Sequence, residues 1–148
     1  MAFLHSLDIS GSGLTASRLR MDVISENIAN SETTRTAQGG PYRRKMVVYQ
    51  CNDSPQTFRS MLDDQTSGGG TVPEGVKVAA VEDDPAPFNT VYDPTDPDAN
   101  AQGYVTKPNV DLIQETTDMM AVSRAYSANL TALDAVKNMA EKALEFGK

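Results

Sequence analysis

Few residues of this chain have a type and spacing that could support chemistry. His5 is the only histidine and Cys51 the only cysteine among 148 residues. A catalytic serine or cysteine needs a base beside it, and one histidine gives neither pairing any sequence support. A single cysteine excludes an intrachain disulfide and cannot found a metal cluster. We therefore expect His5 to be a surface or interface residue.

An Asp-rich stretch is the second place where polar ligands gather. Oxygen side chains at a spacing of two are typical of calcium loops. Here the spacing starts with three, two prolines intervene, and no glutamate follows at the twelfth position. The pattern instead predicts a proline-stiffened turn with Asx hydrogen bonds. The residues concerned are Asp93, Asp96, Asp98 and Asn100.

A run of three glycines, residues 68–70, is not followed by Lys-Ser or Lys-Thr, so it is no phosphate-binding P-loop. The sequence thus predicts no catalytic residue, no cofactor and no metal, and nothing in it favours an enzyme.

The charge distribution limits the possible partners. The chain carries 20 acidic and 13 basic residues, a net charge of -7, and the acidity lies in the middle. The acidic charge therefore argues against nucleic acid as a main partner, because phosphate binding needs basic patches. The run Arg43-Arg44-Lys45 is the only basic cluster, and we expect it to be a solvated strand face. No apolar run is long enough to cross a membrane, and the N-terminus lacks the features of a cleaved Sec signal.

A repeat of seven indicates a helix near the N-terminus. Gly11 and Gly13 weaken it, each by roughly 1 kcal/mol relative to Ala, so we expect a bend there or a helix firm only from about Leu14. Asn30 is expected to be a left-handed C-terminal cap. The apolar positions of the repeat are Phe3, Leu7, Leu14, Met21, Ile24 and Ile28, with Ser10 and Ser17 at the remaining inner positions.

A second, longer repeat covers the C-terminus. Pro108 can open this helix, Asn109 or Asp111 can cap it, and no Pro or Gly interrupts it before Phe146. At 1.5 Å per residue it is roughly 55 Å long, so its stripe must face another long helix. The stripe consists of Leu112, Met119, Tyr126, Leu133 and Ala140, with Val122, Asn129, Val136 and Ala143 beside it.

Two asparagines on or beside these stripes have two readings. A buried Asn129 or Asn27 can fix the register or the number of paired helices, at a cost in stability. Alternatively, each asparagine lies at the partly exposed edge of its stripe, and the sequence favours neither interpretation.

The segment between the helices holds seven of the eight prolines, all but the boundary residue Pro108, and seven of the ten glycines. Short strands are expected at residues 42–50, 56–62, 75–82 and 87–92. The predicted fold class is α+β: an N-terminal helix and polar turn (1–36), a small mostly β insert (37–107) and a long C-terminal helix (108–148). The two helices are expected to pair as a coiled coil. Isolated helices are marginal, so the termini should be poorly ordered until assembly.

Residues 21–36, MDVISENIANSETTRT, resemble the N-terminal motif of bacterial flagellar axial proteins. The match consists of Asn27, Ile28, Ala29 and Asn30, followed by Thr33, Thr34 and Arg35. Three further stretches, 39–48, 92–111 and 119–147, resemble the proximal rod family among these proteins. Glu26 and Glu32 stand where the family more often has small or amide residues.

The resemblance implies a structural subunit that polymerises in the flagellar rod, in the periplasmic space. It implies export through the flagellar type III apparatus without a cleaved signal peptide. Partners would be other copies, other rod proteins, and the inner-membrane ring with its adaptor, with no membrane insertion and no nucleic acid. The residues expected to carry assembly are Leu7, Leu14, Met21, Ile24, Asn27, Ile28, Asn30, Met119, Val122, Tyr126, Asn129, Leu133 and Val136.

Three other readings stay open at this point. The chain could be a different axial subunit. It could be a cytoplasmic coiled-coil adaptor or secretion chaperone, because a net negative charge and helices with an apolar stripe are also compatible with that class. A small metal-binding enzyme using the Asp-rich loop is the third.

Overall fold

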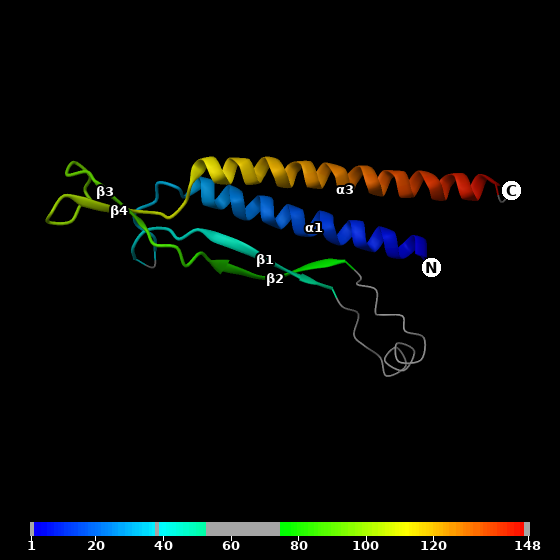
Figure 1. Ribbon diagram of the computed structural model, residues 1–148, viewed down its shortest axis with the longest axis horizontal. Coiled ribbons are helices and arrows are strands. Elements are labelled where there is room, and N and C mark those ends of the chain that lie inside the picture. The colour runs from blue at the N-terminus through cyan, green and yellow to red at the C-terminus, as the bar shows by residue number, and fades with distance from the viewer. Residues whose placement is uncertain (1, 38, 53–74, 147–148) are drawn as a thin grey trace, which may run out of the picture. The chain divides into compact units, whose positions relative to one another are not determined.

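A computed structural model describes residues 2–37, 39–52 and 75–146 of the chain. A long helix stands at each end and four short strands lie between them (Figure 1). The elements are α1 (Ala2–Ala29), β1 (Lys45–Cys51), β2 (Val76–Asp83), β3 (Asn89–Tyr92), β4 (Tyr104–Lys107) and α3 (Leu112–Phe146). The predicted α+β class is therefore confirmed. The strand expected at 56–62 and the glycine run 68–70 lie outside the described residues.

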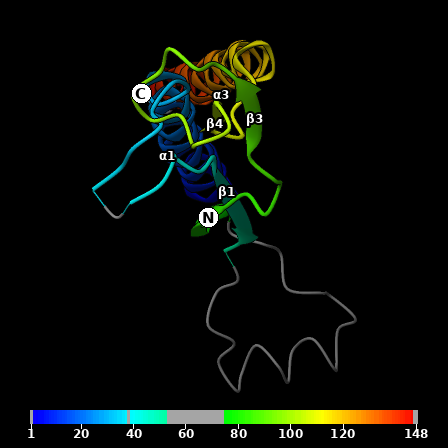
Figure 2. The same cartoon turned by 90° about the vertical axis from the view of Figure 1, so that its left-hand side faces the viewer.

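The chain forms two compact units, and each contains a part of both long helices. Unit 1 comprises residues 1–18, 49–79 and 124–148, and unit 2 comprises residues 19–48 and 80–123. Within each unit α1 and α3 lie side by side (Figures 1 and 2). In unit 2 the Asn27 amide reaches the Glu115 carboxylate, and in unit 1 Gly13 faces Asn129. The helices run antiparallel, because lower numbers on α1 meet higher numbers on α3.

Helix α1 is continuous through both of its glycines. The expectation of a helix firm only from about Leu14 is therefore wrong. A Cβ atom on Gly13 would lie 3.0 Å from the Asn129 side-chain nitrogen, whereas one on Gly11 would meet nothing within 4 Å. Gly13 thus lets α3 approach closely, and packing against α3 offsets the low helix propensity of glycine.

Helix α1 ends without a left-handed residue. No non-glycine residue among the described ones has a positive φ, so the predicted left-handed cap at Asn30 is wrong. Instead, the Asn30 side-chain nitrogen donates to the carbonyl oxygen of Glu26 at 2.9 Å. Thr33 then bonds Asn30 through both its backbone and its hydroxyl group, which turns the chain away.

Helix α3 is capped by Asp111, one of the two predicted candidates. Its Oδ1 accepts from the backbone N–H of Ile113 at 2.9 Å and of Gln114 at 3.3 Å. Leu112, expected on the inner stripe, is 50% exposed. The first inner residue of the helix is Glu115 instead.

The strands form two separate two-stranded sheets, β1–β2 and β3–β4. In the second, Asn89 pairs with Lys107 and Tyr92 with Tyr104 in antiparallel register. Three predicted strands correspond to β1, β2 and β3. Strand β4 was not predicted, although its aromatic and β-branched residues, YVTK, favour a strand.

Candidate assembly site

Twelve of the thirteen residues predicted to carry assembly lie on α1 and α3, and Asn30 directly follows α1. In unit 2, Ile24 is 5% and Val122 6% exposed, and Met21, Ile28 and Met119 are half-buried. In unit 1 the equivalent stripe is half-buried throughout, at Leu7, Leu14, Tyr126, Asn129, Leu133 and Val136. Helix pairing within one chain therefore covers this stripe only in part. Whether these residues also contact other chains stays a prediction.

Asn27 is the best-satisfied polar side chain of the site. It is 1% exposed. Its amide nitrogen donates to the Lys45 carbonyl at 2.9 Å and to Glu115 Oε2 at 3.2 Å. Its oxygen accepts from the Tyr42 hydroxyl at 3.0 Å and from the Lys45 backbone N–H at 2.9 Å. All four hydrogen-bonding positions of the Asn27 amide are therefore filled inside the chain.

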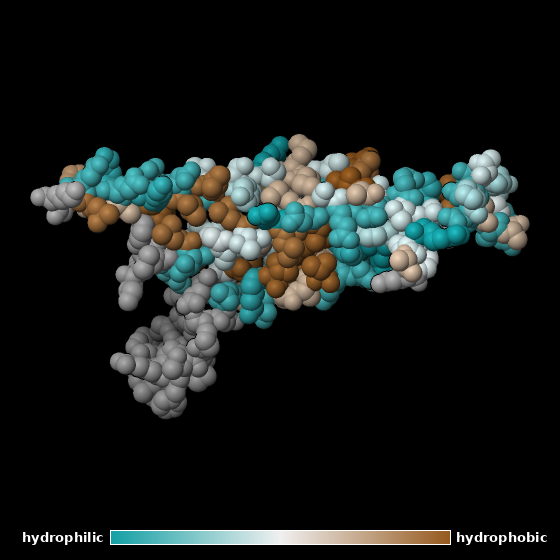
Figure 3. Space-filling model, turned by 180° about the vertical axis from the view of Figure 1, so that it is seen from behind, coloured by the Kyte–Doolittle hydropathy of each residue, from teal (hydrophilic) through white to brown (hydrophobic). Residues whose placement is uncertain are grey.

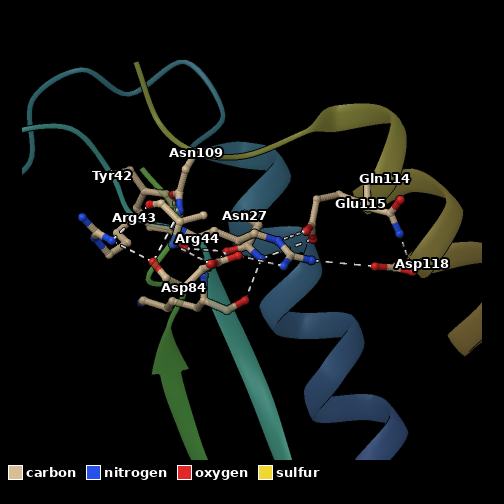
Figure 4. A network of polar contacts seen from close by, with 11 residues as sticks. Asn27, Tyr42, Arg43, Arg44, Asp84, Asn109, Gln114, Glu115 and Asp118 are labelled. Carbon is tan, nitrogen blue, oxygen red and sulfur yellow. Dashed lines mark hydrogen bonds and ion pairs between the residues drawn. The ribbon is translucent and has the colours of Figure 1, made fainter. Parts of the chain in front are cut away.

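Arg44 and Glu115 form the charged centre of the same network (Figure 4). Glu115 is fully buried, and its Oε1 accepts from Arg44 Nε at 2.6 Å. The guanidinium also contacts Asp84 at 3.1 Å and Asp118 at 3.8 Å. The amide of Asn109 accepts from the Arg44 backbone N–H at 2.9 Å. The network thus joins α1, β1, the end of β2 and the first turn of α3.

The basic run Arg43-Arg44-Lys45 is not a solvated strand face, and that expectation is corrected. Arg44 is largely enclosed by the three carboxylates just described. Arg43 donates to the Asp84 carbonyl at 2.7 Å and lies over the Phe88 ring at 4.3 Å. Lys45 pairs with Glu26, so each cation of the run has a specific partner within unit 2.

Electrostatic shifts follow from the enclosure of the network. Burial raises the pKa of Tyr42 to about 12, with nearby carboxylates adding to the effect. For Arg44, burial lowers the pKa, but hydrogen bonds to Glu115 and Asp84 outweigh it and raise the pKa above its ordinary value. The Ala86 backbone N–H and the Arg44 guanidinium lower the pKa of Asp84. The folded chain therefore favours the charged state of the Arg44–Asp84 pair and the neutral state of Tyr42.

The polar turn after α1 is bound to the rest of unit 2. Thr34 donates to Asp98 at 2.7 Å, and Arg35 forms an ion pair with the same carboxylate. Glu32 pairs with Lys107 at 2.7 Å. The Ser/Thr run therefore has partners within its own chain.

The Asp-rich loop forms the Asx turns predicted for it. Asp93 Oδ1 accepts from the Thr95 backbone N–H at 3.1 Å, and Asp96 Oδ1 accepts from the Asp98 N–H at 2.9 Å. Within the described ranges, no group of three His, Cys, Asp or Glu residues could hold a metal ion. None of the described helices is both long and apolar enough to cross a membrane.

Sequence reasoning missed Glu115, although a signal was present. The stripe of α3 repeats three residues after each of its sevenfold members, and three residues after Leu112 stands Glu115. A charged residue at an inner helix position needs a buried partner. The partner, Arg44, lies 71 positions away and could not be chosen from the sequence.

Paired terminal helices, a small β insert and a network of internal contacts are the architecture of a structural protein. Residues 7–35 match the family model described as flagella basal body rod protein, and residues 101–146 match the flagellar basal body rod FlgEFG protein C-terminal model. The chain is 53% identical to the flagellar basal-body rod protein FlgC of Bacillus subtilis (strain 168), over all of both chains. It is 42% identical to that of Borreliella burgdorferi, over 97% of each chain, and 41% identical to that of Escherichia coli O157:H7, over all of both. The chain belongs to the FlgC family of flagellar basal-body rod proteins.

Proposed function

We propose that this protein polymerises in the proximal rod, the shaft that carries motor torque to the hook, through α1 and α3. One observation carries the proposal. Among the described residues seven apolar side chains are buried, whereas sixteen large hydrophobic side chains are exposed. So small a core leaves apolar surface exposed, which neighbouring subunits would cover. Each large side chain that becomes fully buried would stabilise the assembly by ~1.5–3 kcal/mol.

The helices would form the assembly element and the insert, residues 37–107, would point to other neighbours. The contact residues are those named above: Leu7, Leu14, Met21, Ile24, Ile28, Met119, Val122, Tyr126, Asn129, Leu133 and Val136. Asn27 and Asn30 would act indirectly, by holding the end of α1 in place. Partners would be other copies, the other rod proteins, and the inner-membrane ring with its adaptor.

The route to the rod would be the flagellar type III export apparatus, which passes chains unfolded into the periplasmic space without a cleaved signal peptide. Two features support it. Helices that depend on tertiary packing unfold easily when the packing is lost. A chain with one cysteine needs no disulfide to refold after export.

Mass spectrometry of purified hook–basal bodies tests the assignment. We expect the chain at the stoichiometry of a rod subunit, with Met1 or Ala2 as its first residue. A chain found only in the cytoplasm, and stably folded alone by circular dichroism, would instead support the adaptor or chaperone reading.

Charged substitutions test the role of the helices. Leu133→Asp and Ile24→Asp place a charge on the paired faces, so we expect export to continue and incorporation into basal bodies to be lost. Leu133→Met and Ile24→Val keep an apolar side chain of similar volume and serve as matched controls. Normal rods from both aspartate variants would refute assembly through these helices.

A further inference from the structure

One face of the β3–β4 sheet carries two exposed tyrosines. Side chains alternate between the faces of a strand, and Thr90 pairs with Thr106 while Tyr92 pairs with Tyr104, so these four share one face. All four are exposed, Tyr92 by 63% and Tyr104 by 44%. On the opposite face Val105 is buried. We call residues 90, 92, 104 and 106 the tyrosine face.

The Tyr92 ring is held in a fixed position on this face. It meets the Tyr104 ring edge to face, with the centroids 5.2 Å apart. A Cβ atom on Gly103 would lie 2.9 Å from the Tyr92 ring and 3.3 Å from the Pro94 side chain, so the ring packs directly against a glycine backbone. A side chain ordered in advance loses little conformational entropy when a ligand binds. An exposed and ordered tyrosine is typical of the anchor residues of binding surfaces.

Negative charge lies beside the tyrosine face. Asp93 and Asp96 stand in the loop that begins directly after Tyr92. The hydrogen bond to Glu32 raises the pKa of Lys107, and the charges of Asp93 and Asp96 add to this effect, but Lys107 forms its ion pair with Glu32. Within the described part of the chain, neither aspartate has an ion pair of its own. Figure 3 shows hydrophilic side chains gathered at the end of unit 2 that carries β3 and β4. A ligand for this surface should therefore be cationic.

Another part of unit 2 shows how a cation is bound beside an aromatic ring. Arg43 lies over the Phe88 ring, 4.3 Å from its centroid, and donates to the Asp84 carbonyl at 2.7 Å. A guanidinium can stack on a ring and donate two parallel hydrogen bonds to a carboxylate, which a lysine ammonium cannot do. The tyrosine face offers an exposed ring and adjacent carboxylates. Arginine is therefore the side chain that fits it best.

Charge also limits which macromolecule can bring this arginine. A second copy carries the same net charge of -7, so long-range repulsion opposes its approach to an acidic surface. The same repulsion opposes a nucleic acid or an anionic lipid. A neutral glycan could stack on the rings, but it would leave Asp93 and Asp96 uncompensated. A basic segment of a different protein satisfies both the rings and the carboxylates.

We propose that the tyrosine face binds an arginine side chain from a basic surface segment of a different protein. The guanidinium stacks on Tyr92 and pairs with Asp93 or Asp96. The inference rests on the proposed function, because the partner is sought in the assembled basal body. It adds a binding surface outside α1 and α3 and the chemistry of what binds there.

The first test titrates the isolated full-length chain with the peptide acetyl-Gly-Arg-Gly-Arg-Gly-amide and follows the tyrosine rings by NMR. We expect the Tyr92 signals to shift, and not to shift with the same peptide carrying neutral citrulline in place of arginine. Asp93→Asn with Asp96→Asn should weaken binding about fivefold, because asparagine keeps the Asx turns but removes the charge. Asp8→Asn with Asp134→Asn removes two exposed charges elsewhere and should have little effect. Equal shifts with citrulline, or equal weakening by the two double variants, would refute the site.

Substitutions of the ring separate stacking from charge alone. Tyr92→Ser should weaken binding of the arginine peptide about threefold, whereas Tyr92→Phe keeps an aromatic face and should bind like the unaltered protein. The ring is mostly exposed, so neither variant should change the circular dichroism of the chain. Unchanged binding by Tyr92→Ser would show that the ring takes no part.

The second test identifies the partner in purified basal bodies. A photoactivatable cross-linker is attached to Thr106→Cys in a Cys51→Ser background. We expect adducts with an arginine-containing peptide of a different protein, in a yield that falls severalfold when Tyr92→Ser is added. Adducts that join two copies, adducts with glycan, or no adducts would refute the inference.

The outcomes distinguish this inference from the proposed function. Thr106 lies in β4, outside both helices, so the Thr106→Cys variant should still enter basal bodies through α1 and α3. If Leu133→Asp blocks incorporation while the Thr106→Cys adducts join two copies of the chain, the proposed function stands and this inference fails. Absence of the unaltered protein from basal bodies would refute both.

Discussion

At the residue scale, the most informative group is the buried charge of Glu115. Removing a carboxylate from water costs several kcal/mol, and a partner with good geometry is needed to repay it. Two partners meet this need: Arg44 Nε donates to Glu115 Oε1 at 2.6 Å, and the Asn27 amide nitrogen donates to Glu115 Oε2 at 3.2 Å. A buried pair of this kind tolerates the loss of one member poorly, since the other charge is left uncompensated.

Glu115→Gln should therefore destabilise the chain by about 3 kcal/mol. The variant leaves the Arg44 charge without its closest carboxylate and sets one amide nitrogen against that of Asn27. Urea denaturation followed by circular dichroism measures the change. Asp118→Asn is the matched control: its carboxylate is 3.8 Å from Arg44 and partly exposed, so the cost should stay below about 1 kcal/mol. Equal costs for the two variants would contradict the central role of Glu115.

Tyr42 makes a second prediction, on the dependence of stability on alkaline pH. Burial raises its pKa from 10.0 to about 12. The folded chain thus holds the phenol neutral, so this contribution is complete below pH 10 and is lost as the pH rises from about 10 to about 12. Tyr42→Phe has no phenol to ionise. We expect the unaltered protein to be more stable by about 1 kcal/mol at pH 8, from the hydrogen bond to Asn27.

That difference should shrink as the pH rises above 10, as measured by urea midpoints from pH 8 to pH 11.5. Tyr92→Phe alters a ring that is 63% exposed and serves as the control. A difference between the unaltered protein and Tyr42→Phe that stays constant over this pH range would contradict the burial of the Tyr42 hydroxyl.

At the element scale, both long helices could be predicted from the sequence because a sevenfold repeat is a local signal. The network could not, because it joins Asn27, Arg44 and Glu115 across contacts up to 88 positions apart. Strand β4 was missed because it directly follows an Asp- and Pro-rich loop, and four residues carry little periodicity. Asn30 shows a different limit of prediction from sequence. Its side chain donates to the Glu26 carbonyl while its own φ stays negative. An asparagine at this position could equally adopt a left-handed conformation, so the residue type alone does not distinguish the two ways of ending the helix.

The two glycines of α1 allow a direct test of close helix packing. Gly11→Ala should stabilise the chain by about 1 kcal/mol, because it adds helix propensity and meets no neighbour. Gly13→Ala should gain less, since its Cβ atom would press on Asn129 at 3.0 Å. In an Asn129→Ala background the full gain should return. A double-mutant cycle by thermal denaturation measures this coupling. Additive effects would show that Gly13 and Asn129 do not restrict each other.

At the scale of the whole molecule, the two units differ in how well each is held together. Among the residues whose burial the structure describes, six of the seven buried apolar side chains belong to unit 2, and Ala16 belongs to unit 1. The buried polar side chains, Asn27 and Glu115, are also in unit 2. Local stability follows buried apolar contacts and protected hydrogen bonds, so the part of each helix in unit 1 and the part in unit 2 should open at different free energies.

Hydrogen exchange of the isolated chain, followed by mass spectrometry, should reveal this difference. We expect slow exchange in residues 19–29 of α1 and 112–123 of α3, which include the network residues Asn27 and Glu115. Residues 5–18 and 124–146 should exchange much faster, because their stripe is only half-buried in the free chain. In purified basal bodies all four segments should be protected, since neighbouring subunits would cover residues 5–18 and 124–146. Glu115→Gln supplies the control within unit 2: it should accelerate exchange in residues 112–123 and leave the fast segments unchanged. Uniform protection along both helices in the free chain would show that the helix pair is complete before any neighbour binds. That result would contradict the expectation that residues 5–18 and 124–146 become ordered on assembly.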